Sequence, residues 1–122
     1  EVPETFIGTD IVSVHRINDV LKRHGERFKN KTYTLTEIDY CQSKANPEIH
    51  YSGRFAAKES IQKAIYSSGH KDIIPLNMIE IISGEDGEPI VQLLSAIPGQ
   101  CKVSISHTAD TAIAFALYNP EK

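Results

Sequence analysis

Cysteine is scarce in this 122-residue chain, which contains only Cys41 and Cys101. The two thiols lie far apart in the sequence and do not form a CxxC pair. A disulfide framework or a structural zinc site requires more cysteines, or more closely spaced ones. The scarcity therefore argues against both, and we expect a reducing, cytoplasmic environment for the protein.

Long apolar runs are missing as well. No run approaches the roughly 20 residues that a membrane helix requires, and the first residues lack the pattern of a signal peptide. We therefore expect no membrane partner. Neither a GxxxxGK[ST] loop nor a GxSxG motif occurs, which argues against P-loop nucleotide hydrolysis and against serine-hydrolase chemistry.

Charged residues are distributed unevenly along the chain. The formal net charge is −3, which argues against nucleic acid as a partner. Between Arg16 and Lys31, however, six lysines and arginines stand against only two acidic residues. This asymmetry predicts a basic docking surface that fits an acidic protein partner.

The first half of the chain predicts one strand and three helices. Phe6–Val12 is expected to be a buried strand, although a polar Thr-Asp pair interrupts it. A helix should follow with Ser13 as its N-cap and Gly25 as its stop. A second helix should begin near residues 36–39, and a third should run from about Tyr51 to Tyr66.

After Gly69 the pattern changes to short strands separated by turn signals. The expected strands are Ile79–Ile82, Ile90–Leu94, Val103–Ser106 and Ala112–Tyr118. The last of these is apolar on both faces, so it should be central in a sheet or buried against another subunit. The length and the order of the elements predict a single α+β domain over residues 1–122, in which a C-terminal antiparallel strand meander follows the strand and three helices.

The segment Gly53–Lys63, GRFAAKESIQK, is the most informative part of the sequence. On a helix, Arg54 and Lys58 are one turn apart, and so are Glu59 and Lys63. One carboxylate then stands among several cations above an apolar stripe. The same pattern is also typical of an ordinary solvated helix face.

Two further polar features lie where apolar residues are expected. Asp10 interrupts a hydrophobic strand, and a carboxylate there is costly unless it is paired; it could equally be a helix cap, a partner of Arg16, or a functional group. His107 and Thr108 end an alternating strand, where a histidine is usually only a satisfied surface residue.

Taken together, these residues resemble the holo-acyl-carrier-protein synthase family, the small phosphopantetheinyl transferases. The resemblance spans nearly the whole chain in four blocks: Gly8–Val12 with Arg16-Ile17, Gly53–Glu59 with Lys63-Ala64, Ile79–Ile81 before Gly87 and Pro89, and Val103–His107. Two departures, Thr9 and the turn Tyr66–Gly69, put details of the cofactor loop in question without removing a charged residue.

The resemblance implies transfer of the 4′-phosphopantetheine group from coenzyme A to a serine of an apo acyl carrier protein, with release of adenosine 3′,5′-bisphosphate. It implies Asp10, Glu59 and Lys63 as catalytic residues, and Asp10 and Glu59 as ligands of Mg²⁺. Such a reaction depends on charge neutralisation and alignment. The serine could be activated by a metal-ordered water or by Glu59.

The resemblance also implies the remaining site residues. Those expected to bind coenzyme A are Arg54, Lys58, Lys63, Gly69, Pro89, His107 and Thr108. Those expected to dock the carrier protein are Arg16, Arg23 and Arg27. A homotrimer with sites between subunits and a role in fatty-acid and lipid metabolism are further implications.

Two other functions stay open from the residues alone. One is a silent module that holds coenzyme A or a carrier protein without turnover. The other is a small Mg²⁺-dependent phosphohydrolase that uses the same two carboxylates. The sequence also leaves open which carrier protein is served, and whether the chain is free-standing or part of a larger synthase.

Overall fold

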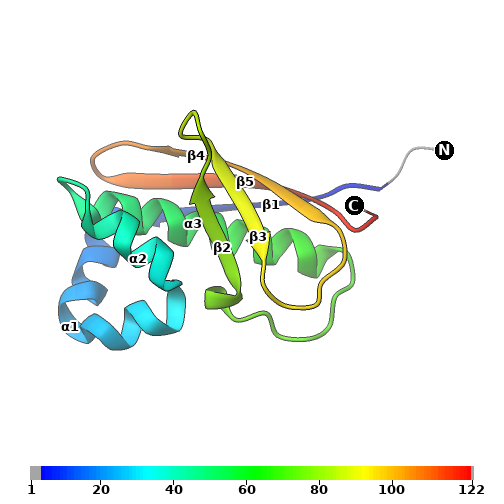
Figure 1. Ribbon diagram of the computed structural model, residues 1–122, viewed down its shortest axis with the longest axis horizontal. Coiled ribbons are helices and arrows are strands. Elements are labelled where there is room, and N and C mark those ends of the chain that lie inside the picture. Colours follow the sequence, from blue (N-terminus) through cyan, green and yellow to red (C-terminus); the bar gives the residue numbers. More distant parts are fainter. Residues whose placement is uncertain (1–3, 122) are drawn as a thin grey trace.

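The computed structural model describes residues 4–121 and has an α+β architecture, as the sequence predicts (Figure 1). The first half contains, in order, β1 (Phe6–Ser13), α1 (Val14–Thr32), α2 (Leu35–Gln42) and α3 (Pro47–Ser67). The second half contains a 3₁₀ turn, η1 (Leu76–Met78), then β2 (Ile79–Ser83), β3 (Pro89–Leu93), β4 (Gln100–His107) and β5 (Thr111–Asn119). None of the described helices is both long enough and apolar enough to cross a membrane.

The strands form two antiparallel sheets. One is three-stranded in the order β1-β5-β4, and the other is the β2-β3 hairpin. The C-terminal strands therefore do not form one continuous sheet, because β2 and β3 pair only with each other. The N-terminal strand β1 pairs with β5 and forms an edge of the larger sheet. In the register of that sheet, Asp10 lies opposite Ala114, and Ala114 lies opposite Ile105.

The helix α3 packs along one face of the three-stranded sheet (Figure 1). The side chains that β5 turns toward it are small: Ala112, Ala114 and Ala116 are all buried. Small residues let the helix approach the sheet closely, and α3 contributes Ala57, Ile61, Ala64 and Ile65 to the shared core.

The opposite face of this sheet is open in the single chain. Its exposed apolar residues are Ile7, Ile11, Ile113, Phe115 and Leu117. The prediction of a buried β1 was therefore wrong for its outer face, where Ile11 is 66% exposed. The prediction that β5 is central in the sheet is confirmed, but its outer face is not covered by any described element.

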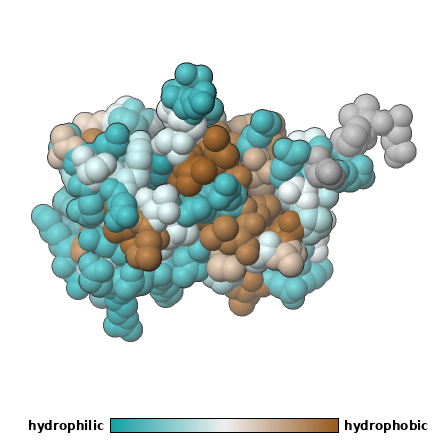
Figure 2. All heavy atoms as spheres, viewed as in Figure 1, coloured by the Kyte–Doolittle hydropathy of each residue, from teal (hydrophilic) through white to brown (hydrophobic). Residues whose placement is uncertain are grey.

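A second apolar region lies on another side of the molecule. Figure 2 shows brown side chains gathered around the β2-β3 hairpin, next to a largely hydrophilic area over the helices at the other end. Exposed apolar residues there include Ile73, Ile90 and Leu94.

The helix α1 begins as predicted and is interrupted at the predicted residue, but a second helical segment follows that the sequence did not predict. Ser13 is its N-cap, and the Ser13 hydroxyl accepts a hydrogen bond from the Arg16 N–H at 3.3 Å. Gly25 has φ 42° and ψ −118°, a conformation that L side chains rarely adopt. The first helical segment ends at this kink, and a second segment continues from it to Thr32 in a new direction.

Candidate active site

Asp10 and Lys63 meet where β1 crosses α3. The Lys63 ammonium donates to Asp10 Oδ1 at 3.2 Å and to the carbonyl oxygen of Thr9 at 2.9 Å. The Asp10 side chain is 11% exposed and the Lys63 side chain is 56% exposed. A mostly buried carboxylate on the strand is thus paired with a cation that still reaches solvent.

Glu59 lies one turn before Lys63 on α3 and completes this group. Burial raises the pKa of Glu59, the neighbouring Asp10 carboxylate raises it further, and Lys63 opposes the shift. Two neighbouring carboxylates in a partly buried place repel one another when both are charged. A divalent cation between them would relieve that repulsion.

The donor set fits Mg²⁺. Asp10 Oδ2 is buried and has no hydrogen-bond partner among the described residues. The described part of the chain holds no group of three or more His, Cys, Asp or Glu side chains placed for a metal. Mg²⁺ typically takes one or two carboxylates and completes its shell with waters and substrate phosphates. Asp10 and Glu59, with one buried and unpaired carboxylate oxygen, supply the protein ligands that such a Mg²⁺ site requires.

A pocket of about 330 Å³ opens beside the two carboxylates. Asp10 and Glu59 line it together with Arg16, and its apolar walls are Val12, Ile17, Val20, Phe28 and Phe55. A second cleft of about 270 Å³ shares Phe28 with it. That cleft is lined by His24, Arg27 and Lys31, which belong to both sides of the bend in α1.

The three arginines predicted to dock a partner are all exposed. Arg16 and Arg23 stand two turns apart on the first segment of α1, and Arg27 stands on the second. Arg16 lines the pocket and Arg27 lines the second cleft, whereas Arg23 is exposed outside both. The bend at Gly25 lies between Arg23 and Arg27, so the three arginines do not share one straight helix face.

Arg54 lies away from the carboxylates. It is buried, its Nη2 donates to the Ser83 hydroxyl at 3.4 Å, and its guanidinium carbon is 4.0 Å from the centre of the Tyr40 ring. Its Nε has no hydrogen-bond partner among the described residues.

The other residues predicted to bind coenzyme A lie in turns and strand ends. His107 is the last residue of β4 and is exposed. Thr108 follows it, and its hydroxyl accepts from the N–H groups of Asp110 and Thr111. Gly69 follows α3 with φ 103°, and Pro89 is the first residue of β3.

The helix α3 separates Arg54 from the two carboxylates. Arg54 and Glu59 are five residues apart, which on a helix is about 140° around the axis and about 7.5 Å along it. Arg54 contacts α2 and β2, whereas Lys63 contacts β1. Within a single chain, Asp10, Glu59 and Lys63 therefore lie together, and Arg54 lies on a different side of α3.

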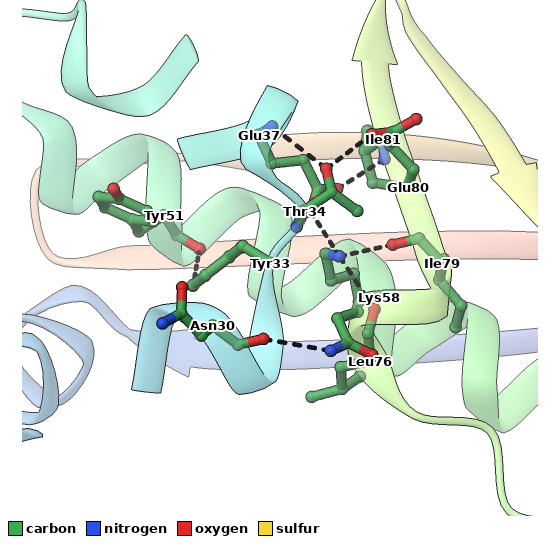
Figure 3. A network of polar contacts seen from close by, with 11 residues as sticks. Asn30, Tyr33, Thr34, Glu37, Tyr51, Lys58, Leu76, Ile79, Glu80 and Ile81 are labelled. Carbon is green, nitrogen blue, oxygen red and sulfur yellow. Dashed lines mark hydrogen bonds and ion pairs between the residues drawn. The ribbon is translucent and has the colours of Figure 1, made fainter. Parts of the chain in front are cut away.

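Lys58 lies in the interior, away from both the Asp10–Glu59–Lys63 cluster and Arg54. Its ammonium donates to Glu37 Oε1 at 2.6 Å, to the Leu76 carbonyl at 2.9 Å and to the Ile79 carbonyl (Figure 3). Both side chains of the ion pair are fully buried. All three donors of the ammonium are used, so we do not retain Lys58 among the proposed phosphate-binding residues.

The fold and the sequence both match known transferases. Residues 6–116 match the model of the 4′-phosphopantetheinyl transferase superfamily. The chain belongs to this superfamily. A holo-[acyl-carrier-protein] synthase of Chlorobaculum parvum is 42% identical over 116 residues, which cover 93% of this chain and 97% of that protein. A similar protein from Protochlamydia amoebophila is 37% identical over 119 residues, covering 93% and 96%.

A solved structure of a superfamily member supports the fold in detail. The Helicobacter pylori holo-[acyl-carrier-protein] synthase, determined in complex with coenzyme A, matches with a TM-score of 0.81 and 30% identity. The match covers 93% of this chain and 99% of that one. The predicted family and fold class are thus confirmed.

Three residues near Arg54 were not predicted as site residues. Tyr40, Lys44 and His50 gather there, although they belong to α2, the loop after it, and α3. Their spacing follows no motif, and only the folding of α2 against α3 brings them together. Phe28 and Phe55, which line the pocket beside Asp10, were likewise not predicted as site residues.

Proposed function

We propose that this transferase moves the 4′-phosphopantetheine group from coenzyme A to a serine of an apo acyl carrier protein, in a Mg²⁺-dependent reaction that releases adenosine 3′,5′-bisphosphate. The observation that carries the proposal is the convergence of Asp10 and Glu59 on one pocket, with Lys63 paired to Asp10. The names of the relatives and the coenzyme A complex of the Helicobacter pylori protein support it.

Asp10 and Glu59 would hold Mg²⁺, which supplies positive charge at the pyrophosphate and helps to align it. The unsatisfied Oδ2 of Asp10 and the raised pKa of Glu59 are the properties that favour this assignment. In the reaction, the serine oxygen attacks the phosphorus that carries the pantetheine. The bond from that phosphorus to the bridging oxygen breaks, and the nucleotide leaves with the electron pair.

Lys63 is suited to stabilise the charge that develops on the phosphate oxygens. Its ammonium is held by the Asp10 carboxylate and the Thr9 carbonyl, yet the side chain stays half exposed. A preoriented cation of this kind needs little rearrangement when the negative charge shifts to the leaving group.

Arg54, Gly69, Pro89, His107 and Thr108 would bind the rest of coenzyme A, with Arg54 and His107 at its outer phosphate. The helix α3 holds Arg54 on a different side from Glu59. We therefore propose that each active site combines Asp10 and Glu59 of one subunit with Arg54 of a neighbouring subunit. A homotrimer with sites between subunits satisfies this requirement.

The open face of the three-stranded sheet supports the same assembly. Ile7, Ile11, Ile113, Phe115 and Leu117 form a contiguous apolar surface that a monomer would expose to water. Such patches on folded proteins mark interaction surfaces.

Arg16, Arg23 and Arg27 would dock the carrier protein. All three are exposed; Arg16 lines the pocket that contains the carboxylates, and Arg27 lines the second cleft. A basic surface at the mouth of the pocket would steer an acidic partner and fix its register. We place the reaction in the cytoplasm and in fatty-acid synthesis, as the family resemblance implies.

Mass spectrometry tests the proposed reaction directly. An apo acyl carrier protein is incubated with the protein, coenzyme A and Mg²⁺, and separately with EDTA. A mass gain of one phosphopantetheine that requires Mg²⁺ is the expected result. An unchanged carrier protein with intact coenzyme A would instead indicate a binding module, and coenzyme A breakdown without transfer would indicate a phosphohydrolase.

A further inference from the structure

The second segment of α1, residues 26–32, is joined to the first segment only through the kink at Gly25. Because the backbone of Gly25 is not helical, the first segment does not fix the direction of the second, and contacts with other elements must set it. We call residues 26–32 the docking arm. It carries Arg27, which lines the second cleft, and Phe28, which lines both that cleft and the pocket. The direction of the docking arm therefore determines where these two side chains stand relative to the carboxylates.

Aromatic packing holds one side of the docking arm against α3. The Phe28 ring meets the Tyr33 ring edge-on at a centroid distance of 5.8 Å and lies 6.2 Å from the Phe55 ring. Apolar burial stabilises such contacts without strict direction. Directional contacts are therefore needed to fix the docking arm along the surface that it covers.

Two hydrogen bonds from η1 and β2 supply this direction at the end of the docking arm (Figure 3). Asn77 Nδ2 donates to the carbonyl oxygen of Asn30 at 3.1 Å. Two residues after the docking arm, the Thr34 hydroxyl donates to Glu80 Oε2 at 2.6 Å. A hydroxyl-to-carboxylate bond of this length is charge-assisted and strongly directional. The end of the docking arm is thus tied to one place beside β2.

The bond from Thr34 to Glu80 goes beyond what α2 requires. Thr34 is the N-cap of α2, and its hydroxyl accepts from the Glu37 N–H at 3.3 Å. The Thr34 N–H donates in return to Glu37 Oε1 at 2.9 Å. This capping box is complete without the hydroxyl proton. The proton is therefore free to join Thr34 to Glu80, a residue 46 positions away in the sequence.

We propose that Glu80 and Asn77 are positioning residues that fix the docking arm for the carrier protein. Glu80 acts through Thr34, and Asn77 acts through Asn30. A docking arm that is already oriented loses less conformational freedom on binding, so the partner binds more tightly while the chemical step is unaffected. The inference rests on the proposed function, which assigns Arg27 to docking and gives no role to Glu80 or Asn77.

The charge and the hydrogen bond of Glu80 have opposite expected effects on docking. Removing a negative charge near a basic surface strengthens the attraction to an acidic partner. Removing the hydrogen-bond acceptor frees the docking arm and weakens binding. Glu80→Gln removes the charge and keeps an acceptor oxygen, whereas Glu80→Leu removes both. A higher KM in Glu80→Leu alone therefore reports the position of the docking arm and not the charge.

Steady-state kinetics with an apo acyl carrier protein as the varied substrate test the inference. Glu80→Leu should raise KM for the carrier protein by about five- to tenfold, and Asn77→Leu by about threefold because its hydrogen bond is neutral. In both variants kcat and the KM for coenzyme A should stay unchanged. Glu80→Gln should resemble the wild type. Thr34→Ser keeps the hydroxyl and should do the same, whereas Thr34→Val should resemble Glu80→Leu.

The double variant Thr34→Val/Glu80→Leu should raise KM little more than Glu80→Leu alone, because both changes remove the same bond. Gln92→Leu is the matched control, since Gln92 lies opposite Glu80 on β3 and is exposed. It should leave KM for the carrier protein unchanged. Thermal melting of each variant measures the folded fraction separately. If Thr34→Val fails to fold, Glu80→Leu, Glu80→Gln and Asn77→Leu still decide the outcome.

Hydrogen exchange without the carrier protein measures the docking arm itself. In Glu80→Leu the amides of residues 28–32 should exchange faster, while those in the first segment of α1 keep their protection. Unchanged exchange in residues 28–32 would overturn the inference. A lower or unchanged KM in Glu80→Leu, or equal increases in Glu80→Gln and Glu80→Leu, would also overturn it.

Binding without turnover separates this inference from the proposed function. Calorimetry uses a carrier protein whose acceptor serine is changed to alanine, in the presence of coenzyme A. Binding that Glu80→Leu weakens, without transfer to the unmodified carrier, would remove the proposed reaction and keep the positioning role. Transfer by the wild type with equal carrier affinity in every variant would remove the inference and leave the proposed function intact. Absence of both binding and transfer in the wild type would overturn both.

Discussion

The backbone of Gly8 on β1 lies directly against the carbonyl oxygen of Ser60 on α3. A Cβ atom built at Gly8 would stand 2.1 Å from that oxygen and 2.7 Å from the Ala64 nitrogen. No side chain fits at this crossing, so only glycine permits the observed distance between strand and helix. Asp10 lies two residues farther along β1 on the same face, where it meets Lys63.

Gly8→Ala should therefore displace β1 from α3 and separate Asp10 from Glu59 and Lys63. We expect a loss of about 1–3 kcal/mol in the free energy of unfolding, because overpacked cores typically cost this much. Transfer activity should fall much further than the folded fraction. Urea denaturation and kcat/KM measure the two effects. Lys71→Ala, on an exposed loop, is the control. An active Gly8→Ala enzyme would show that this crossing does not position Asp10.

The two carboxylates should act as a unit. Asp10→Asn and Glu59→Gln should each abolish most turnover, and the double variant should cost little more than either one. A Mg²⁺ titration of activity checks the metal assignment, since both single variants should need far more metal. If Asp10→Asn lost only thermal stability and kept its activity per folded molecule, the residue would be structural.

The buried pair of Lys58 and Glu37 should contribute to stability and not to substrate binding. Lys58→Met leaves the Glu37 carboxylate uncompensated in the interior, which should cost about 3–5 kcal/mol of unfolding free energy. The double variant Lys58→Met/Glu37→Gln removes that charge and should recover part of the loss. Lys71→Met, on an exposed loop, is the control. A rise in KM for coenzyme A without loss of stability would return Lys58 to the cofactor site.

Lys58 also shows why parts of the site could not be predicted. On a helical projection it lies among polar residues, and nothing local distinguishes it from Lys63. The difference arises because α2 and β2 cover Lys58 and present Glu37 and two carbonyl groups to it. Tyr40 and His50 were missed for the same reason, since their proximity depends on how two helices pack.

The fold was predicted more completely because its signals are local. Alternating apolar residues, the Ser13 cap and the turn glycines each determine a short segment, and they located nearly every element. Gly25 shows where prediction from local signals ends. Glycine indicates an unusual backbone conformation, but whether the helix resumes after it depends on packing against α3 and η1.

Variants of the docking arginines should weaken binding of the carrier protein without affecting the binding of coenzyme A. Arg16→Glu and Arg23→Glu should raise KM for the carrier protein, weaken the dependence of association on salt, and leave the affinity for coenzyme A unchanged. Lys22→Glu makes the same charge change on another face of α1 and is the matched control. Reduced coenzyme A binding in Arg16→Glu would assign this residue to the cofactor pocket.

The trimer can be tested by mixing inactive variants. Asp10 and Lys63 meet within one chain, so variants of these two residues should not rescue each other. Asp10→Asn and Arg54→Ala, by contrast, affect groups that we place in different subunits of one site. Each mixed trimer can then form an intact site between an Arg54→Ala chain, which keeps Asp10, and an Asp10→Asn chain, which keeps Arg54.

Equal mixing with subunit exchange should restore activity at about a quarter of the sites, given closed cyclic symmetry. Phe115→Glu, which places a charge on the open face of the sheet, should abolish both assembly and this rescue. Light scattering measures the mass of each species. A fully active wild type with the mass of one 13.6 kDa chain would refute the trimer, and the Arg54 group would then have to serve the carboxylates of its own chain.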